Sequence, residues 1–310
     1  MRSRNIIIVG VLDNPASSNV WMANSFIRYG FNVIPINYRK IVREYGRLFF
    51  ENLMIDTVKN FDPYLTIFCK FNGMDPNIIS ECNKYTRSWL WMPDSYMIAK
   101  QHPDIVESAK RTNFSSCQSQ TTIDYFEEEG VKNCYHIFEG VEPNIHKPVD
   151  FDEKFKADIS FIGSKTTTRD YYKKALEDNR YNVKFYGNGY SDRVSVEDWA
   201  KICSSSKFML SLNTFNDIPN YFSGRVFETL ACEVCTLHLD TTNTLTAFFE
   251  DGKEIIFFNS VIDLFDKINN TNLEAAKEIA INGRKRVLRD YTFDKSVSKI
   301  INIVEKVNEI

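Results

Sequence analysis

The segment FMLSLNTFNDIPNYFSGRVFETLACEVCTLHLDTTNTLTAFFEDGKEIIFF, residues 208–258, decides the expected fold. It predicts a buried strand over 208–212, a polar loop, a short helix from about Arg225, a second strand over 235–239, another helix, and a third strand over 254–258. Strands that alternate with helices favour a parallel sheet with crossover helices. We therefore expect the loop after Leu212 at the carboxyl edge of a sheet, where open α/β folds bind ligands.

The start of the short helix offers groups that can bind an anion. Ser223 and Gly224 precede it, and a helix amino terminus presents unpaired N–H groups and a partial positive charge. Arg225 adds a full charge on a planar guanidinium that suits phosphate oxygens. Glu228 shares its helical face, so the two side chains can form an intrahelical ion pair. They can equally place a cation on a diphosphate and a carboxylate on two sugar hydroxyls.

Several segments resemble, in the same order, the C-terminal half of CgeB-like glycosyltransferases, which belong to the two-domain GT-B superfamily. They are DISFIGS at 158–164, SKFMLSLN at 206–213, GRVFETLAC at 224–232, FEDGKEI at 249–255 and NGRKRV at 282–287. The resemblance spans roughly residues 136–300, and the N-terminal part matches in architecture only. It implies two Rossmann-like α/β domains, each a doubly wound parallel sheet, that face each other across a cleft.

The resemblance also implies that the second domain holds a nucleotide sugar. Glu228 would then bind the donor ribose and Arg225 the diphosphate. A strand that runs into Gly163 and Ser164 lets main-chain N–H groups approach a phosphate closely, and by resemblance this is the donor-diphosphate loop. Taken alone, the same residues fit a tight turn with a helix cap at Thr168 equally well.

Further donor-binding residues are expected in the loops that follow the strands of this domain. Lys165 and Arg169 can bring charge to the diphosphate, and Gly187 lies, by resemblance, beside the nucleotide base. Small polar groups follow two other strands and suit phosphate or sugar hydroxyls; they are Asn213, Thr241 and Thr242.

The first domain supplies two candidate catalytic carboxylates. Asp13 lies in the loop after the first strand of a βαβ unit, and this loop resembles the one that faces the acceptor in GT-B enzymes. The loop lacks the G-x-G-x-x-G signature, which disfavours a nicotinamide cofactor. Asp94 follows the strand at 87–92, where a carboxylate can act as a base on an acceptor hydroxyl. Both residues can also be helix caps.

The expected domains are residues 1–147, residues 148–290, and a helix over 291–310 that returns to the first domain. We expect transfer of a hexose from a nucleotide sugar, with a UDP-sugar favoured, to a hydroxyl of a glycan, a protein or a modified DNA base. The resemblance implies no metal and no cofactor other than the sugar nucleotide. Two alternatives keep the fold: a catalytically idle, spore- or virion-associated binding protein, and a nucleotide-sugar epimerase.

Charge, cysteine content and hydropathy indicate the class of protein and its expected cellular compartment. The net charge is −3 and the pI about 5.9, so no global field favours nucleic acid. Seven scattered cysteines predict reduced thiols, and Cys232-x-x-Cys235 lacks the partners of a zinc site. No apolar run reaches about 18 residues, so we expect a cytoplasmic chain, in the host if it is viral.

Other charged residues have plainer expected roles. His136 is expected to pack in a core and His146 to lie in a surface loop. Four basic residues are expected to form a solvated helix face, or alternatively to bind an anionic acceptor. They are Arg284, Lys285, Arg286 and Arg289.

Two positions depart from the family pattern. Asn220 occupies the place of a first glutamate in retaining GT-B enzymes, which leaves retention or inversion of the anomeric centre open. Glu233 occupies the place of a glycine, which can reshape the turn into the following strand.

Overall fold

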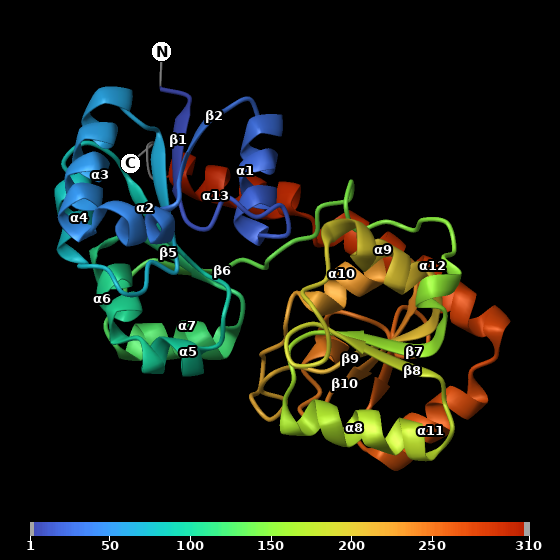
Figure 1. Cartoon of the computed structure of the whole chain (residues 1–310). Helices are drawn as coiled ribbons and strands as arrows, with labels where there is room; N and C mark the ends of the chain where they lie inside the picture. Colours follow the sequence, from blue (N-terminus) through green and yellow to red (C-terminus); the bar gives the residue numbers. More distant parts are fainter. Residues whose placement is uncertain (1–2, 307–310) are drawn as a thin grey trace. The chain divides into compact units, whose positions relative to one another are not determined.

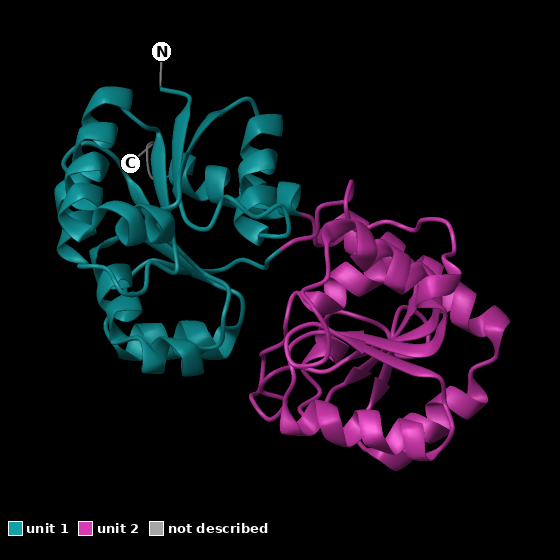
Figure 2. Ribbon diagram, viewed as in Figure 1, with its two compact units in different colours: residues 1–139, 293–310 teal, residues 140–292 magenta. Residues whose placement is uncertain are grey.

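The computed structural model describes residues 3–306. The chain divides into two compact units, shown in different colours in Figure 2. Unit 1 comprises Met1–Glu139 and Phe293–Ile310, and unit 2 comprises Gly140–Thr292. Residues 140–147, expected in the first domain, therefore lie in unit 2.

Unit 1 is a six-stranded parallel sheet between helices (Figure 1). In sheet order the strands are β2 (Asn32–Ile36), β1 (Asn5–Val9), β3 (Leu65–Cys69), β4 (Ser88–Met92), β5 (Phe114–Cys117) and β6 (Cys134–His136). The helices are α1 (Ser18–Arg28), α2 (Tyr38–Tyr45), α3 (Arg47–Phe61), α4 (Asn77–Cys82), α5 (Tyr96–Gln101), α6 (Pro103–Arg111), α7 (Gln120–Glu128) and α13 (Phe293–Lys306).

Unit 2 is a five-stranded parallel sheet of the same kind. Its sheet order is β11 (Ile256–Phe258), β10 (Cys235–Leu239), β9 (Ser206–Ser211), β7 (Ala157–Ile162) and β8 (Val183–Tyr186). Its helices are α8 (Thr167–Asp178), α9 (Val196–Ser204), α10 (Arg225–Ala231), α11 (Val261–Asn270), α12 (Leu273–Asp290) and the 3₁₀ helices η1 (Glu153–Phe155) and η2 (Leu245–Ala247).

The period of two along β9 explains why both faces of the unit 2 sheet are covered. Phe208 and Leu210 pack in one apolar cluster with Leu176 of α8, whereas Met209 packs in another with Cys203 of α9. Successive side chains of a strand point to opposite faces, so an unbroken apolar run buries both. The expected fold class, doubly wound parallel sheets in two domains, is confirmed.

The last helix belongs to unit 1. Asp294 at the start of α13 forms an ion pair of 2.7 Å with Arg28 of α1 and accepts a hydrogen bond of 2.6 Å from Ser25. Trp21 of α1 meets Phe293 edge to face at 6.1 Å. Residues 307–310 of the expected terminal helix lie outside the described part of the chain.

Two helical regions are divided or shortened by the backbone. The chain between β2 and β3 forms two helices rather than one, because Gly46 adopts a φ of 85° between α2 and α3. The helix expected between 239 and 254 is only the 3₁₀ turn η2. Asp240 accepts hydrogen bonds from the N–H groups of Thr244 and Leu245, at 2.9 and 2.8 Å, and so closes a tight turn there.

Candidate functional site

Two glycines bring the loops after β7 and β8 together at the carboxyl edge of the unit 2 sheet. A Cβ on Gly163 would lie 2.7 Å from Cζ of Phe161 and 3.1 Å from Nη2 of Arg225. Gly187 has a φ of 104°, and a Cβ there would lie 2.8 Å from the carbonyl oxygen of Gly163. The N–H of Lys165 donates to Asn188 O at 2.7 Å. Only residues without a side chain fit this approach.

Two guanidinium groups converge on one aromatic ring beside Gly163. The guanidinium carbons of Arg169 and Arg225 lie 5.0 and 5.5 Å from the centroid of Phe161. The charge of Glu228 acts on Arg225. Two guanidiniums beside one carboxylate leave this edge with an excess of positive charge, which suits a ligand with concentrated negative charge.

Arg169 is a buried link between two loops. Its side chain is 1% exposed and donates from Nη1 to Ser164 O at 2.7 Å and from Nη2 to Leu212 O at 2.9 Å. Burial, and then the charge of Arg225, lower the pKa of Arg169 to about 10. A side chain so enclosed does not offer the direct phosphate contact expected from the sequence; it joins the ends of β7 and β9.

Arg225 is the more accessible of the two cations. Its Nη1 donates to Leu212 O at 3.3 Å, and its pKa is lowered by burial, with the charge of Glu228 opposing that effect. The charges of the two side chains thus act on each other across the first turn of α10. Glu228 also lies on the first turn of α10, partly exposed.

The amino end of α10 offers charge rather than free amides. The N–H of Arg225 donates to Ser223 Oγ at 3.4 Å, and the N–H of Val226 donates to Ser223 O at 3.2 Å. The N–H of Ser223 is bonded as well, to Asn213 Oδ1 at 2.9 Å, so several main-chain donors of this tip have partners within the chain.

The remaining donor-loop residues fall into two groups. Ser164 and Lys165 are exposed, and Lys165 lies 3.4 Å from Asp170. Thr241 donates to Asn216 O in the loop after β9, and the hydroxyl of Thr242 lies 2.7 Å from that of Thr244 in the loop after β10.

Asn213, by contrast, is 4% exposed and fixes the main chain of its own loop. Its Oδ1 accepts from the N–H of Ser223 at 2.9 Å, and its N–H donates to Asn216 Oδ1 at 2.9 Å. Asn213 therefore holds the main chain that leads into α10 in place.

A buried histidine lies under the site and was not among the residues expected there. His238 of β10 is buried, and its Nδ1 lies 2.9 Å from Ser211 Oγ of β9. Burial lowers its pKa to about 4, Asp240 opposes the shift and Arg225 adds to it. A lone histidine within an apolar strand is typical of a core residue, so the sequence carried no stronger signal.

Unit 1 has its own polar cluster at the carboxyl edge of its sheet. Asp94 forms an ion pair with Lys70, which follows β3. Lys70 and Phe71 both have positive φ, 59° and 62°, an unusual conformation for residues with side chains. Burial raises the pKa of Glu139, which follows β6; the charge of Asp94 raises it further, and Ser18 and Lys70 oppose the shift.

The alternative role of helix cap is wrong for both candidate carboxylates. Ser95 caps α5 by accepting from the N–H of Met97, and Ser17 caps α1 by accepting from the N–H of Asn19. Asp94 is half-buried beside Lys70, and Asp13 is exposed in the loop after β1.

Both histidine expectations are wrong. His146 is 2% exposed; its Nδ1 accepts from the N–H of Glu142 at 3.3 Å, and burial lowers its pKa to about 4. His136 is exposed, and its Nε2 lies 2.8 Å from Gln118 O.

The basic run of α12 is largely used inside the protein. Arg284 donates to Ala231 O and pairs with Glu233 at 3.6 Å. Arg286 donates to Phe248 O at 3.1 Å and pairs with Asp290 at 2.9 Å. These contacts fix α12 to the loops beneath it, so an anionic acceptor has few free cations here.

Residues 3–306 contain neither a cluster of metal ligands nor a membrane-spanning helix. No group of three or more His, Cys, Asp or Glu side chains in this range could hold a metal ion. Asp150 and Asp152 have Asp-x-Asp spacing, but Asp152 caps η1 by accepting from the N–H of Lys154 at 3.0 Å. None of the described helices combines the length and apolarity needed to cross a bilayer.

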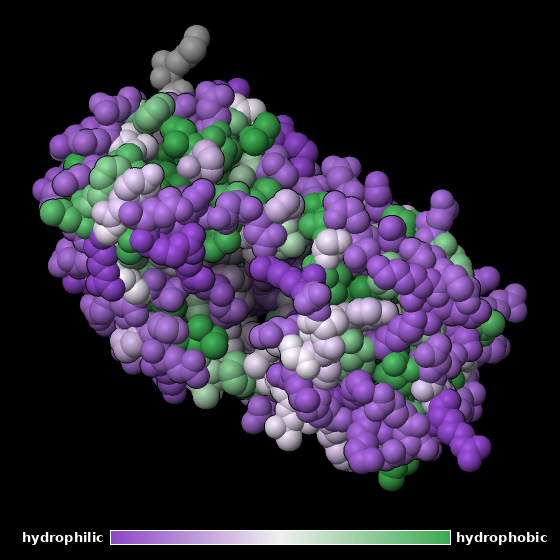
Figure 3. All heavy atoms as spheres, viewed as in Figure 1, coloured by the Kyte–Doolittle hydropathy of each residue, from purple (hydrophilic) through white to green (hydrophobic). Residues whose placement is uncertain are grey.

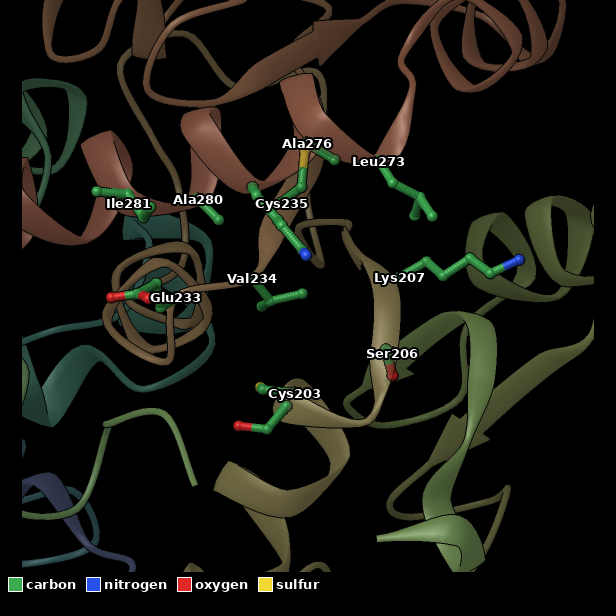
Figure 4. Close-up of a pocket in the computed structure, with 12 residues that line it drawn as sticks. Cys203, Ser206, Lys207, Glu233, Val234, Cys235, Leu273, Ala276, Ala280 and Ile281 are labelled. Carbon is green, nitrogen blue, oxygen red and sulfur yellow. The ribbon is translucent and has the colours of Figure 1, made fainter. Parts of the chain in front are cut away.

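A pocket of about 370 Å³ lies away from these loops (Figure 4). It opens where β9 and β10 begin, so it is at the opposite edge of the sheet from Gly163. Its lining includes Ser206 and Lys207 from β9 and Ala276 and Ala280 from α12 (Figure 4). The pocket therefore does not belong to the donor site.

Comparisons with known proteins bear on the fold and on the family pattern. Residues 168–302 match the model of a family described as glycosyl transferase-like. No curated protein sequence matches the chain. The chain is similar to an α-glucosyltransferase solved with UDP and a 13-mer DNA containing an HMU base, with a TM-score of 0.69, 12% identity and coverage of 97% of this chain and 99% of that one.

Two further solved structures are similar over nearly their whole length. A sucrose-phosphate synthase from Thermosynechococcus elongatus has a TM-score of 0.66 at 10% identity, covering 98% of this chain and 99% of its own. HepE from Anabaena, solved with UDP-glucose, has a TM-score of 0.64 at 11% identity, covering 96% and 99%. The chain thus has the fold of the GT-B glycosyltransferase superfamily, and its residues 168–302 carry the pattern of the glycosyl transferase-like family.

Proposed function

We propose that this protein is a glycosyltransferase that moves a hexose from a nucleoside diphosphate sugar to an acceptor hydroxyl. The observation that carries the proposal is the pair Arg169 and Arg225, two guanidiniums held against Phe161 at the carboxyl edge of the unit 2 sheet. A diphosphate suits this concentration of positive charge. The motifs at 158–164 and 224–232 favour the CgeB-like branch of the superfamily.

The donor residues have distinct proposed roles. Arg225 and Lys165 contact the diphosphate, and Gly163 and Ser164 let it approach the main chain. Glu228 binds the ribose hydroxyls. As the bond from the anomeric carbon to the diphosphate breaks, negative charge grows on the leaving group, and fixed cations stabilise that charge without reorganising.

A uridine diphosphate sugar is the favoured donor. Similar structures were solved with UDP and with UDP-glucose, and their similarity extends over nearly the whole of this chain. The reaction is proposed to need no metal, since Arg225 and Lys165 supply positive charge at the proposed diphosphate position.

The acceptor is proposed to be a hydroxyl of a glycan, a protein or a modified DNA base. One similar structure contains DNA with an HMU base, which supports testing the last of these. Asp94 is the proposed base for the acceptor hydroxyl and Asp13 the second candidate. Lys70, the ion-pair partner of Asp94, keeps that carboxylate oriented at the sheet edge.

Thermal unfolding with a panel of nucleotide sugars tests the proposal. A ligand that binds only the folded state raises the free energy of unfolding, by about 2.7 kcal/mol at a hundred times its Kd. The melting temperature rises as a result. We expect one UDP-sugar to raise it, Arg225→Met to abolish the rise, and Glu228→Ala to reduce it. Arg193→Met, a change at an exposed arginine of the same unit, should leave it intact. A panel with no stabilising member would contradict the proposal.

Product analysis separates transfer from the alternatives. Conversion of the sugar without acceptor would indicate an epimerase. The chain is similar to a Listeria monocytogenes protein assigned as a UDP-N-acetylglucosamine 2-epimerase, with a TM-score of 0.59 at 8% identity. The similarity covers 99% of this chain and 97% of that one. Binding with neither conversion nor transfer, with cell extract as acceptor source, would indicate a catalytically idle protein.

A further inference from the structure

The corner where α2 meets α3 has two apolar sides. Its inner side is used by the core of unit 1, through Tyr38 of α2 and Phe50 and Met54 of α3. Gly46, at a φ of 85°, turns the chain between the two helices. The residues that immediately flank this turn point the other way. We call residues 40–49 the α2–α3 corner.

Three large apolar side chains at this corner face solvent. Tyr45 is 63% exposed, Leu48 72% and Phe49 49%. The rings of Tyr45 and Phe49 lie 5.0 Å apart, so these side chains form a patch rather than isolated contacts. Single exposed apolar residues are normal on a protein surface, whereas clustered ones mark interaction sites. Figure 3 shows apolar residues in green on one face of the molecule.

Cations surround the apolar side chains. Lys40, Arg43 and Arg47 are exposed, and none forms an ion pair with any of residues 3–306. Glu44 is the sole acidic residue of the corner, so three positive charges stand against one negative charge in a chain whose net charge is −3. Arg39, just before the corner, is instead bound to Asn72 at 2.8 Å.

We propose that the α2–α3 corner docks the protein on an anionic lipid bilayer. Exposed apolar tips gain by entering the boundary between headgroups and acyl chains, and cations beside them gain from acidic headgroups. Tyrosine is favoured at that boundary because its ring is apolar and its hydroxyl polar. A nucleic acid duplex, whose bases are stacked inside, would use the cations but would give Leu48 and Phe49 no apolar environment.

Vesicle co-sedimentation of the full chain tests this. Vesicles of phosphatidylcholine with about 30% phosphatidylglycerol should bind it, and pure phosphatidylcholine should bind it much less. Each basic residue near an anionic surface contributes about fivefold to partitioning, so Arg43→Gln with Arg47→Gln should weaken binding about 25-fold. Leu48→Ser with Phe49→Ser should also weaken it. Ile262→Ser, at a side chain 82% exposed on α11, is the matched control and should bind as the wild type does.

Several results would overturn the proposal. One is equal binding to both vesicle types; another is unchanged binding of the Leu48→Ser, Phe49→Ser variant. Dimerisation in light scattering that this variant abolishes would identify the corner as a contact between copies of the chain. Salt-sensitive binding to duplex DNA that the arginine variant abolishes, without vesicle binding, would identify a nucleic-acid surface. All substituted side chains are exposed, so folding should persist, and circular dichroism checks this.

Discussion

Replacing Arg169 by methionine tests whether this side chain supports the donor loops or contacts the donor itself. The guanidinium makes hydrogen bonds of 2.7 and 2.9 Å to Ser164 O and Leu212 O. A hydrogen bond from a charged donor contributes about 1.5–3 kcal/mol, and relief from burying a cation offsets part of the loss. Leu212 O also keeps its bond from Arg225. We expect a net destabilisation of about 2–4 kcal/mol.

The measurement is thermal unfolding followed by circular dichroism. A loss of about 2–4 kcal/mol corresponds to a fall in melting temperature of roughly 5–12 °C for a domain of this size. Arg169→Lys keeps the charge but cannot reach both carbonyl oxygens with a planar fork, so it should fall between. Arg193→Met, at an exposed site, controls for the loss of one positive charge.

The two roles give different outcomes. A positioning residue, once replaced, lowers the melting temperature without ligand and weakens nucleotide-sugar binding as a consequence of loop movement. A residue that contacts phosphate directly would lower the affinity while leaving the unliganded melting temperature within about 2 °C of the wild type. That second pattern would refute the positioning role of Arg169.

Three other sites each carry a prediction. Gly187→Ala should lower both the melting temperature and the stabilisation by nucleotide sugar, because the φ of Gly187 is 104° and the new Cβ would meet Gly163 O at 2.8 Å. Gly252→Ala controls for backbone strain alone, since Gly252 has positive φ but nothing lies within 4 Å of the new Cβ. His146 and His238 have pKa values lowered to about 4 from 6.5, so the unfolded chain binds more protons between those values. In urea unfolding, the free energy of unfolding should have its full value above pH 6.5. It should fall by up to about 1.4 kcal/mol per pH unit for each histidine as the pH drops towards 4. A flat profile would contradict the burial of the two histidines. Asp94→Asn should abolish transfer in a product assay while nucleotide-sugar stabilisation persists, and unchanged turnover would remove it as the base.

The sequence was sufficient where local pattern and long-range structure agree. Apolar runs such as 208–212 predict buried strands, and their alternation with helices predicts parallel pairing, because a crossover needs a helix. The positions of Gly163 and Arg225 after strands predict the same sheet edge. These inferences rest on period and order along the chain, which the sequence states directly.

The tertiary structure decided which side chains are accessible and what they contact. It buried Arg169, His146 and Asn213, exposed His136, and left the hydrophobic Leu48 in solvent. Each outcome depends on residues distant in sequence that supply or withhold hydrogen-bond partners and apolar neighbours. The burial of such an individual side chain is a property of the packed whole, so no local pattern specifies it, whereas apolar runs, period and chain order are local and can be read directly from the sequence.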